Sequence, residues 1–418
     1  MLHKSIEDSL LKMQREAKEQ RNLSSENKNK LLKALAQALL SQTTELLAAN
    51  QLDLKNLPTE TAPSFRDRLS LNPARIESMA ESLRQVSDLP DPVGELIEEK
   101  ILANGLKLKK VLAPLGTIFM IFESRPNVIL EAFSLAFKSG NSIVFRGGSD
   151  SKQTAAVIYA MMSSVFKVQG FTVSFYGIQD YERSLVEQLL KRKDLIDVVV
   201  PRGGEKLIEF VQKTSLMPII KNDRGLCHTY VDEDADLKMA VQIVNNAKTH
   251  RPGVCNSLET VLVHKNCASD FLTQLYQATD SAKLFWRVDS RSEKILHDKS
   301  RVQIAAPVDW DTEHLDLIIN CKVVDSFDQA LEHIAGHGSK HSEAIVTKSE
   351  AKARRFQSEV DAAAVYWNAS TRFTDGFEFG LGGELGISTQ KLHVRGPVGL
   401  RELTTARWLI DGTGQIRS

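Results

Sequence analysis

The chain of 418 residues has little of what marks secreted, membrane-bound or nucleic-acid-binding proteins. Lys plus Arg and Asp plus Glu both number 53, so the zero net charge gives no general attraction for nucleic acid or an anionic membrane. The longest strongly apolar stretch, residues 111–122, contains a proline and a glycine and is too short to span a bilayer. The N-terminus has charges of both signs and no apolar signal core. The chain has four scattered cysteines, Cys227, Cys255, Cys267 and Cys321, which form no disulfide framework. We therefore expect a reducing, cytoplasmic compartment.

The first hundred residues are predicted to be helical. Leu31, Leu35 and Leu39 recur every four residues and make one apolar stripe, with Ser24 as a cap for this helix. A second helix is predicted over residues 73–86, and the prolines that follow it end it.

From about residue 100 the pattern changes to strands. Residues 101–111 predict a hairpin around the two-residue turn Asn104-Gly105. Strands and helices then alternate, which is typical of a parallel sheet covered on both faces. The predicted strands are 117–122, 142–145, 171–176 and 196–200, with helices at 128–139, 152–166, 181–191 and 205–213. A second such region begins near residue 225, with a helix at 234–248 and strands at 230–231, 258–263, 317–324, 343–347 and 363–367.

One cysteine stands in a setting that suits chemistry. Cys255 follows the turn of Arg251-Pro252-Gly253 and precedes the apolar run 258–263. A turn-borne cysteine beside cationic side chains ionises readily, and the thiolate is the nucleophile. The alternative is an inert, small apolar residue. If Cys255 reacts, the chain is an acyl-transfer or aldehyde-level enzyme that needs a cofactor.

Two Arg-Gly-Gly turns each end a strand and precede a helix. Residues 146–148 and 202–204 therefore lie where a doubly wound fold binds ligands, and their glycines allow backbone to approach a phosphate. Neither is the GxGxxG fingerprint, so the alternative is two tight turns that need glycine. An RNA-binding RGG tract requires clustered repeats, which these are not.

Two polar loops that follow strands hold further candidates. Arg125 or Asn127 would supply a donor for an oxyanion, or else belong to a capped surface loop. Ser370, Thr371 and Arg372 would hold a carboxylate, with the arginine as a bidentate clamp, or else form a solvated loop. The adjacent pair at 227–228 predicts no metal site, because neighbours on a strand point to opposite faces.

Taken together, these segments resemble the gamma-glutamyl phosphate reductase family within the aldehyde dehydrogenase superfamily. The matching stretches run in order from about residue 110 to the end: ESRPN at 123–127, KSGN at 138–141, RGG at 146–148, PRGG at 201–204, GLCH at 225–228, NAKTHRPGVCN at 246–256, NASTRFTDG at 368–376 and STQKLHVRGP at 388–397.

The resemblance implies an aldehyde dehydrogenase-like α/β fold with two doubly wound parallel-sheet domains plus a small β oligomerisation flap. The implied NADP-binding domain spans residues 1–98 and 113–225, and the catalytic domain spans 226–395. The flap spans 99–112 and 396–418 and should combine the hairpin with the C-terminal strand. A homodimer or higher homo-oligomer is implied, with glutamate 5-kinase as a further candidate partner.

The implied reaction is the second step of proline biosynthesis. L-glutamyl 5-phosphate is reduced by NADPH to L-glutamate 5-semialdehyde, with release of phosphate. The thiolate of Cys255 attacks the acyl carbon, and the resulting thioester accepts hydride. The oxyanion is held by the backbone N–H of Cys255 and by Arg125 or Asn127, a choice that stays open. Lys248 and Arg251 are the candidates for the leaving phosphate.

The cofactor residues also follow from the resemblance. Arg146 matches a position that contacts the adenosine ribose and is expected to bind ribose or a 2′-phosphate. Ser149 stands where relatives that prefer NAD often carry an acid, which favours NADP, although Asp150 is adjacent. Glu313 aligns with the glutamate that binds the nicotinamide ribose. The glycines of the two turns complete this predicted set: Gly147, Gly148, Gly203 and Gly204.

One departure from the wider superfamily bears on the reaction. Aldehyde-oxidising members carry a general-base glutamate, whereas this chain has DRGLCH at 223–228, with Asp223 near that position. A reductase that releases phosphate has no use for a hydrolytic water, so the absence favours the acyl-phosphate reductase. Two alternatives are a hydrolytic NAD(P)-dependent semialdehyde dehydrogenase and a non-catalytic protein that has kept the fold.

Overall fold

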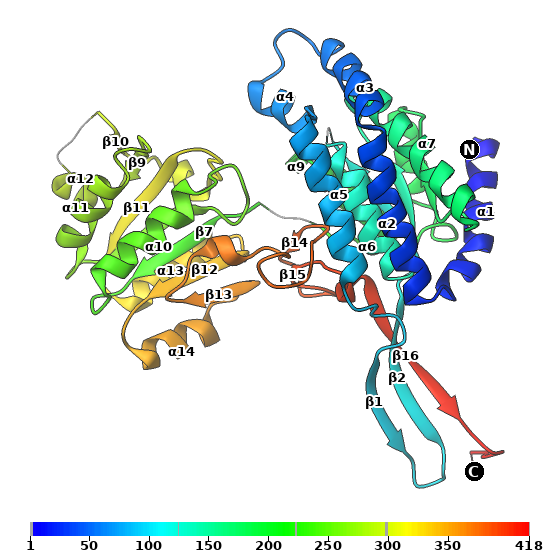
Figure 1. Ribbon diagram of the computed structural model, residues 1–418. Helices are drawn as coiled ribbons and strands as arrows, with labels where there is room; N and C mark the ends of the chain where they lie inside the picture. Colours follow the sequence, from blue (N-terminus) through cyan, green and yellow to red (C-terminus); the bar gives the residue numbers. More distant parts are fainter. Residues whose placement is uncertain (1–2, 124, 222–223, 297–299, 418) are drawn as a thin grey trace. The chain divides into compact units, whose positions relative to one another are not determined.

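The computed structural model describes residues 3–417 apart from 124, 222–223 and 297–299, and without the side chains of 63–64. The chain divides into two compact units (Figure 1). The first comprises Met1–Lys221, Gly380–Gly386 and Val398–Ser418, and the second comprises Asn222–Phe379 and Ile387–Pro397.

The first unit begins with the predicted helices: α1 (Lys4–Arg21), α2 (Ser25–Ser41), α3 (Thr43–Lys55), α4 (Pro63–Leu69) and α5 (Pro73–Asp88). The predicted cap is confirmed, because the Ser24 hydroxyl accepts a hydrogen bond from the Asn27 amide at 3.3 Å. The stripe residues Leu31, Leu35 and Leu39 are fully buried. Helix packing thus uses the apolar face that the spacing predicts.

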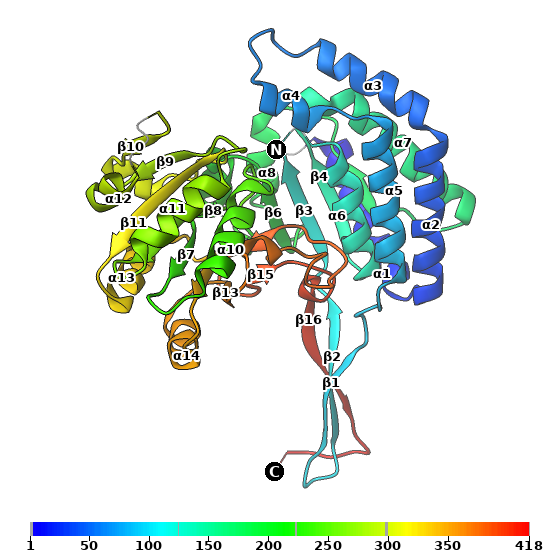
Figure 2. The ribbon, with the colours of Figure 1, turned by 60° about the vertical axis from the view of Figure 1, so that its left-hand side comes forward.

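A four-stranded parallel sheet in the order β5-β4-β3-β6 forms the centre of this unit. Its strands are β3 (Thr117–Phe122), β4 (Ser142–Arg146), β5 (Phe175–Gly177) and β6 (Val198–Arg202), connected by α6 (Asn127–Lys138), α7 (Lys152–Gln169) and α8 (Arg183–Leu189), with α9 (Glu205–Thr214) after β6. Ile6 and Leu10 of α1 pack with Leu185 and Leu189 of α8 in one core cluster beside Phe119 and Val144. Figure 2 shows α6, α5 and α2 lying successively outward from β3 and β4.

One predicted strand is much shorter than expected. Residues 171–174 lie outside β5, because the chain leaves α7 through Gly170 at φ 72° and the Phe171 amide still bonds to the Phe166 carbonyl at 2.9 Å. The backbone is therefore free to pair with β4 only from Phe175 onward.

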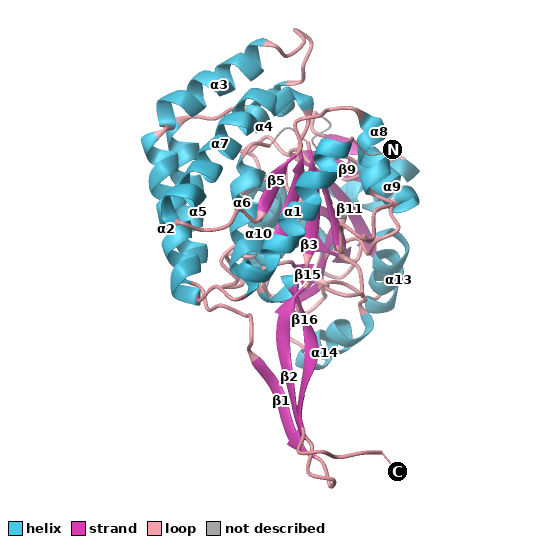
Figure 3. Cartoon of the chain, turned by 90° about the vertical axis from the view of Figure 1, so that its right-hand side faces the viewer, coloured by secondary structure: helices cyan, strands magenta, loops and turns pink. Residues whose placement is uncertain are grey.

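A three-stranded antiparallel sheet also belongs to the first unit. It contains β1 (Leu96–Ile101), β2 (Lys107–Pro114) and β16 (Thr404–Asp411) in the order β1-β2-β16 (Figure 3). The expected pairing of the hairpin with the C-terminal strand is present. The expected two-residue turn is wrong, because Leu102 pairs with Leu106 and leaves residues 103–105 as the loop, with Gly105 at φ 86°.

The second unit is built on a seven-stranded parallel sheet in the order β10-β9-β11-β8-β7-β12-β13. The strands are β7 (Cys227–Val231), β8 (Leu258–His264), β9 (Phe285–Val288), β10 (Val302–Ile304), β11 (Ile318–Val324), β12 (Ser342–Val346) and β13 (Ala364–Trp367). One face packs against α10 (Leu237–Thr249), α11 (Ala268–Ala278) and α12 (Ser290–Ile295), and the other against α13 (Phe327–His337) and α14 (Glu350–Glu359). The short pair β14 (Ile387–Ser388) and β15 (Gly396–Pro397) completes the unit.

Short 3₁₀ helices η1 (Ser149–Ser151), η2 (Pro307–Asp311), η3 (Thr371–Phe373) and η4 (Arg401–Leu403) connect these elements. Within the described ranges, none of the helices has the length and apolarity needed to cross a membrane. Over the same residues, no cluster of three or more His, Cys, Asp or Glu side chains is placed to hold a metal ion.

Candidate active site

The loop between α10 and β8 carries Cys255. The Ser257 amide bonds to the Val254 carbonyl at 3.0 Å, and the Ser257 hydroxyl bonds back to Ala247 of α10 at 3.3 Å. These contacts hold Cys255 in a tight turn in which its side chain is only half-buried. The thiol is therefore accessible while its backbone is held in place.

The other three cysteines are buried. Burial raises the pKa of the Cys227 thiol well above its usual range, that of Cys267 to about 11 and that of Cys321 to about 12. A buried thiol that stays protonated is a poor nucleophile. Accessibility therefore distinguishes Cys255 from every other cysteine of the chain.

The start of β7 lies directly against the Cys255 backbone. A Cβ added at Gly225 would stand 1.5 Å from the Cys255 carbonyl oxygen, so only glycine fits there. The Cys227 thiol donates to the same carbonyl oxygen at 3.2 Å. Sequence reasoning found the stretch that contains both residues but missed this supporting role, because the contact joins segments far apart in the chain.

The loop after β13 is fastened to the residue that follows the nucleophile. The Asn256 side-chain amide donates to the Thr374 carbonyl at 2.8 Å, and the Thr371 hydroxyl donates to the Asn256 carbonyl at 2.8 Å. Ser370 accepts a bond from the Arg372 amide at 3.3 Å. The structure thus joins the two predicted segments, but the Ser370 hydroxyl already bonds within its own loop and the Thr371 hydroxyl already bonds to Asn256.

Arg372 gives the site positive charge. Burial of its half-buried guanidinium and the nearby Arg251 cation lower the pKa of Arg372, and the charge of Cys255 acts on it in the opposite direction. Its Nε atom is buried and has no hydrogen-bond partner among the described residues. Arg251 itself is exposed. Two guanidinium groups near the thiol suit an anionic substrate or leaving group.

Lys248, a predicted ligand of the leaving phosphate, lies in a buried ion pair. Its side chain is fully buried, and its ammonium contacts the Glu259 carboxylate at 3.0 Å. A phosphate would have to reach a buried ammonium that already has a carboxylate partner. The prediction that Lys248 binds the leaving phosphate finds no support in this contact, and sequence reasoning did not identify Glu259.

Glu313 lies in a loop tied to the segment just before β7. Its carboxylate accepts a hydrogen bond from the Gly225 amide at 2.8 Å. Two residues later Leu315 has φ 52°, in the left-handed region that non-glycine residues rarely adopt. The contact of Glu313 with the nicotinamide ribose stays a prediction.

The predicted residues of the first unit lie at the carboxyl ends of its strands. Arg146 ends β4, and its guanidinium bonds to the carbonyls of Gly147 and Tyr181, both at 2.6 Å. Burial lowers the pKa of Arg146, and its buried Nε has no hydrogen-bond partner in the part of the chain that is described. Ser149 begins η1 and is exposed, and Asp150 follows it.

One glycine of each turn is also required by packing. A Cβ on Gly147 would approach the Phe122 ring to 2.9 Å, and one on Gly203 would approach the Glu123 carboxylate to 2.7 Å. The Gly204 amide at the start of α9 donates to Glu123 at 2.9 Å, so an internal carboxylate occupies this helix terminus. Tight packing therefore accounts for Gly147 and Gly203, and cofactor contacts through all four glycines of the two turns stay predictions.

The two oxyanion candidates begin the helix after β3. Asn127 is the first residue of α6, and its side-chain amide donates to Glu131 at 2.8 Å. Arg125 is exposed, and its carbonyl accepts a bond from the Val128 amide at 3.0 Å. Both belong to the first unit, and the choice between them stays open. Asp223, the residue near the superfamily's general-base position, lies outside the described residues.

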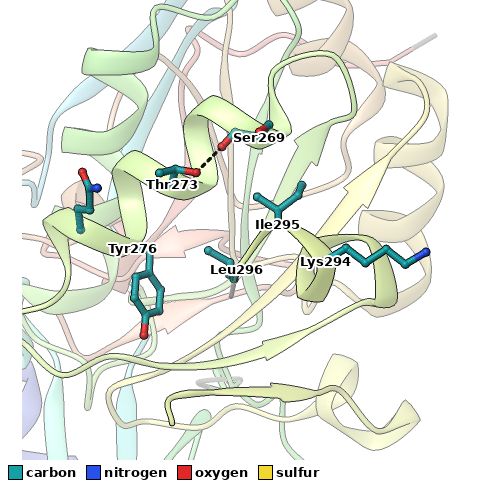
Figure 4. Close-up of a pocket in the computed structure, with 7 residues that line it drawn as sticks. Ser269, Thr273, Tyr276, Lys294, Ile295 and Leu296 are labelled. Carbon is teal, nitrogen blue, oxygen red and sulfur yellow. Dashed lines mark hydrogen bonds between the residues drawn. The ribbon is translucent and has the colours of Figure 1, made fainter. Parts of the chain in front are cut away.

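A surface pocket of about 370 Å³ lies between α11 and α12 of the second unit (Figure 4). Its lining combines polar side chains of α11 with Lys294, Ile295 and Leu296 of the segment around α12. None of the predicted site residues lines it, so it is separate from the site built around Cys255.

Comparisons with known proteins agree with this geometry. Residues 3–293 match the model of the aldehyde dehydrogenase family. The chain is 47% identical over 403 residues to a gamma-glutamyl phosphate reductase from Francisella philomiragia, covering 96% of this chain and 97% of the relative. It is 45% identical over 415 residues to one from Lachnospira eligens, covering 99% of both chains.

Solved structures support the same fold. The crystal structure of gamma-glutamyl phosphate reductase from Thermotoga maritima superposes with a TM-score of 0.94 at 41% identity, covering 98% of this chain and 99% of that one. An acetylating aldehyde dehydrogenase from Geobacillus thermoglucosidasius, 16% identical with a TM-score of 0.71 and covering 99% and 98%, shares the fold.

Proposed function

Because the chain belongs to the aldehyde dehydrogenase family, and within it to the gamma-glutamyl phosphate reductases, we propose that it reduces L-glutamyl 5-phosphate to L-glutamate 5-semialdehyde with NADPH. It is an oxidoreductase acting on the aldehyde level, in proline biosynthesis. The observation that carries the proposal is the full-length match to relatives of this name, combined with one accessible cysteine on a braced loop.

Cys255 is the proposed nucleophile. Its thiolate attacks the acyl carbon, the C–O bond to phosphate breaks, and a thioester forms. The oxyanion accepts a hydrogen bond from the backbone N–H of Cys255 and from Arg125 or Asn127. Hydride reduces the thioester, and the resulting thiohemiacetal collapses to aldehyde and thiol.

The predicted cofactor residues fit NADP. Arg146 stands at the carboxyl end of β4, where this fold binds ligands. Its buried Nε atom lacks a partner within the described ranges, which suits a cation that binds a ribose or a 2′-phosphate. Ser149 is exposed beside it and carries no charge against that phosphate. Glu313 holds the nicotinamide ribose in this proposal. When bound, NADPH supplies the hydride.

Arg251 and Arg372 are the proposed anion ligands. Their charges lie close enough together that Arg251 lowers the pKa of Arg372. An anion between them would relieve this repulsion, and the substrate offers both a phosphate and an α-carboxylate. Ser370 and Thr371 support this role by holding the loop of Arg372.

The alternative function is a hydrolytic semialdehyde dehydrogenase. The chain lacks a glutamate in DRGLCH at 223–228, where aldehyde-oxidising relatives carry their general base. A thioester that meets no activated water survives until phosphate or hydride attacks it. This feature favours the phosphorylating reaction.

The test runs the reaction in reverse, because the acyl phosphate is labile. Glutamate 5-semialdehyde is supplied with NADP or NAD, with and without phosphate, and the reduced cofactor is followed by absorbance. We expect turnover that needs phosphate, prefers NADP and is abolished by Cys255→Ala. Turnover without phosphate would establish the hydrolytic dehydrogenase instead, and turnover in the variant would remove Cys255 from the mechanism. Cofactor binding without any turnover would indicate a non-catalytic protein.

We also propose a homo-oligomer formed through the sheet β1-β2-β16, in the cytoplasm. This sheet exposes large apolar side chains, including Ile101 at 68% and Ile410 at 59%. Exposed apolar strands of this kind are typical of protein interfaces. The kinase that makes the acyl phosphate is a further proposed partner, since a labile intermediate benefits from a short path between enzymes.

A further inference from the structure

The second unit contains a buried ion pair that the proposed mechanism does not use. The Lys248 ammonium and the Glu259 carboxylate lie 3.0 Å apart, with side-chain exposures of 0% and 1%. Lys248 lies in the last turn of α10, seven residues before the nucleophile, and Glu259 lies on β8, four residues after it. The pair therefore spans the base of the loop that carries Cys255.

Stability alone does not explain this pair. Burial raises the pKa of Glu259 to about 7 and lowers that of Lys248, which shows that both charges are costly to bury. Replacing such a pair with apolar residues of similar volume is often neutral or stabilising. A role beyond holding the fold together is therefore worth seeking in the remaining contacts of the pair.

The second oxygen of Glu259 reaches another loop. It accepts a hydrogen bond from the Leu315 amide at 3.3 Å, where the backbone is held at φ 52°. The backbone of His314 also acts to lower the pKa of this carboxylate. A left-handed non-glycine residue persists only when its surroundings hold it there. Glu259 supplies this restraint from inside the unit.

The restrained loop also lies beside the loop of the nucleophile. A Cβ on Gly253 would lie 3.7 Å from the Leu315 carbonyl. On the other side, Glu313 binds the Gly225 amide at 2.8 Å, and Gly225 packs against the carbonyl of Cys255. Glu313 thus connects its own loop, which lies beside Gly253, to the segment of Gly225, which packs against Cys255.

We propose that Lys248 and Glu259 form a positioning pair that fixes loop 312–316, and through it Glu313, against the loop that carries the nucleophile. Lys248 sets the direction of the Glu259 carboxylate, and the carboxylate sets the backbone of the loop. The inference rests on the proposed function, in which Glu313 binds the nicotinamide ribose. It assigns Lys248 to positioning rather than to phosphate binding.

The test measures NADPH affinity by fluorescence titration together with steady-state kinetics. The main variant is Lys248→Met/Glu259→Leu, which replaces the pair by apolar side chains of similar volume and should fold. The matched control is Asp232→Asn, which removes the charge of another buried carboxylate that pairs with a lysine in the same unit, Lys352 at 2.8 Å. We expect the pair variant to weaken NADPH binding about tenfold, as the loss of outer contacts to a ligand residue does, and the control to leave it unchanged.

A double-mutant cycle with Glu313→Gln then decides whether the pair acts through Glu313. If it does, adding Glu313→Gln to the pair variant weakens binding no further. Additive losses, or native affinity in a folded pair variant, would overturn the inference. Failure of the proposed function looks different, because the native protein would then lack phosphate-dependent turnover and Glu313→Gln alone would leave NADPH affinity unchanged.

Discussion

At the scale of single residues, the reactivity of the chain depends on exposure more than on residue type. All four cysteines have the same chemistry, but Cys255 alone stands half-buried on a loop, while Cys321 lies in a central strand. The contacts around Cys255 hold its backbone and leave the thiol accessible.

Selective alkylation should report this difference. Iodoacetamide added to the native protein at neutral pH is expected to label one cysteine per chain, Cys255, because burial keeps the other thiols protonated and covered. Peptide mass spectrometry identifies the label. Labelling in denaturant, where all cysteines should react, is the control, and a second rapidly labelled site in the native protein would contradict the assignment.

The glycine beneath the nucleophile gives a second prediction. In Gly225→Ala the new Cβ would meet the Cys255 carbonyl at 1.5 Å, so the loop must shift by an ångström or so. A displacement of that size costs on the order of 100-fold in kcat. Gly253→Ala is the matched control, because its added Cβ would lie an ordinary 3.7 Å from the Leu315 carbonyl oxygen. Equal activity in the two variants would show that the Cys255 backbone need not be held.

At the scale of elements, helix α13 places titratable groups on the sheet. His333 is buried, its ring lies 5.5 Å from that of His228 and 5.4 Å from that of Trp310, and the Lys322 ammonium is 3.2 Å from its Nδ1. The ring of His337, one turn later on α13, is tilted by 38° against that of His333, with the ring centroids 4.5 Å apart. Burial, followed by the charges of His228, Lys322 and His337, lowers the pKa of His333 to about 2.

This histidine should make the fold sensitive to acid. In the unfolded chain His333 takes up a proton below about pH 6.5, whereas in the folded chain it does so only near pH 2. The free energy of unfolding therefore falls as the pH falls below 6.5. His333→Gln removes up to about 1.4 kcal/mol of this loss per pH unit. Urea unfolding between pH 7 and 5 measures the slope. An unchanged slope in this variant, or an equal change in the exposed control His3→Gln, would refute the account.

Prediction from sequence succeeded where a local pattern decides the structure. The stripe of Leu31 and its neighbours, the strand Thr117–Phe122 and the loop of Cys255 follow from residues close together in the chain. Strands β9 and β10 were missed, because they are short and carry Arg287 and Gln303 among their apolar residues. Glu259 was missed for a different reason, since its buried partners come from separate segments and leave no periodic signal.

At the scale of the whole molecule, association is the property left to test. Large apolar side chains on β1 and β16 are exposed, among them Trp408 at 41% and Ile410 at 59%. Such exposure is expected where a second chain covers the strands. Ile410→Glu is expected to lower the molar mass in solution towards that of one chain, 46.6 kDa. Light scattering measures it, with Leu52→Glu, 55% exposed on α3, as the control. A native protein that is already monomeric would contradict the proposed role of the sheet.

The central claim is that Cys255 carries a thioester that phosphate, rather than water, resolves. The most direct measurement is rapid-mixing kinetics with the semialdehyde and NADP in the absence of phosphate. We predict a burst of one NADPH per Cys255 that then stalls, resumes when phosphate is added, and is absent in Cys255→Ala. Continuous turnover without phosphate, or a burst that survives the loss of the thiol, would contradict it.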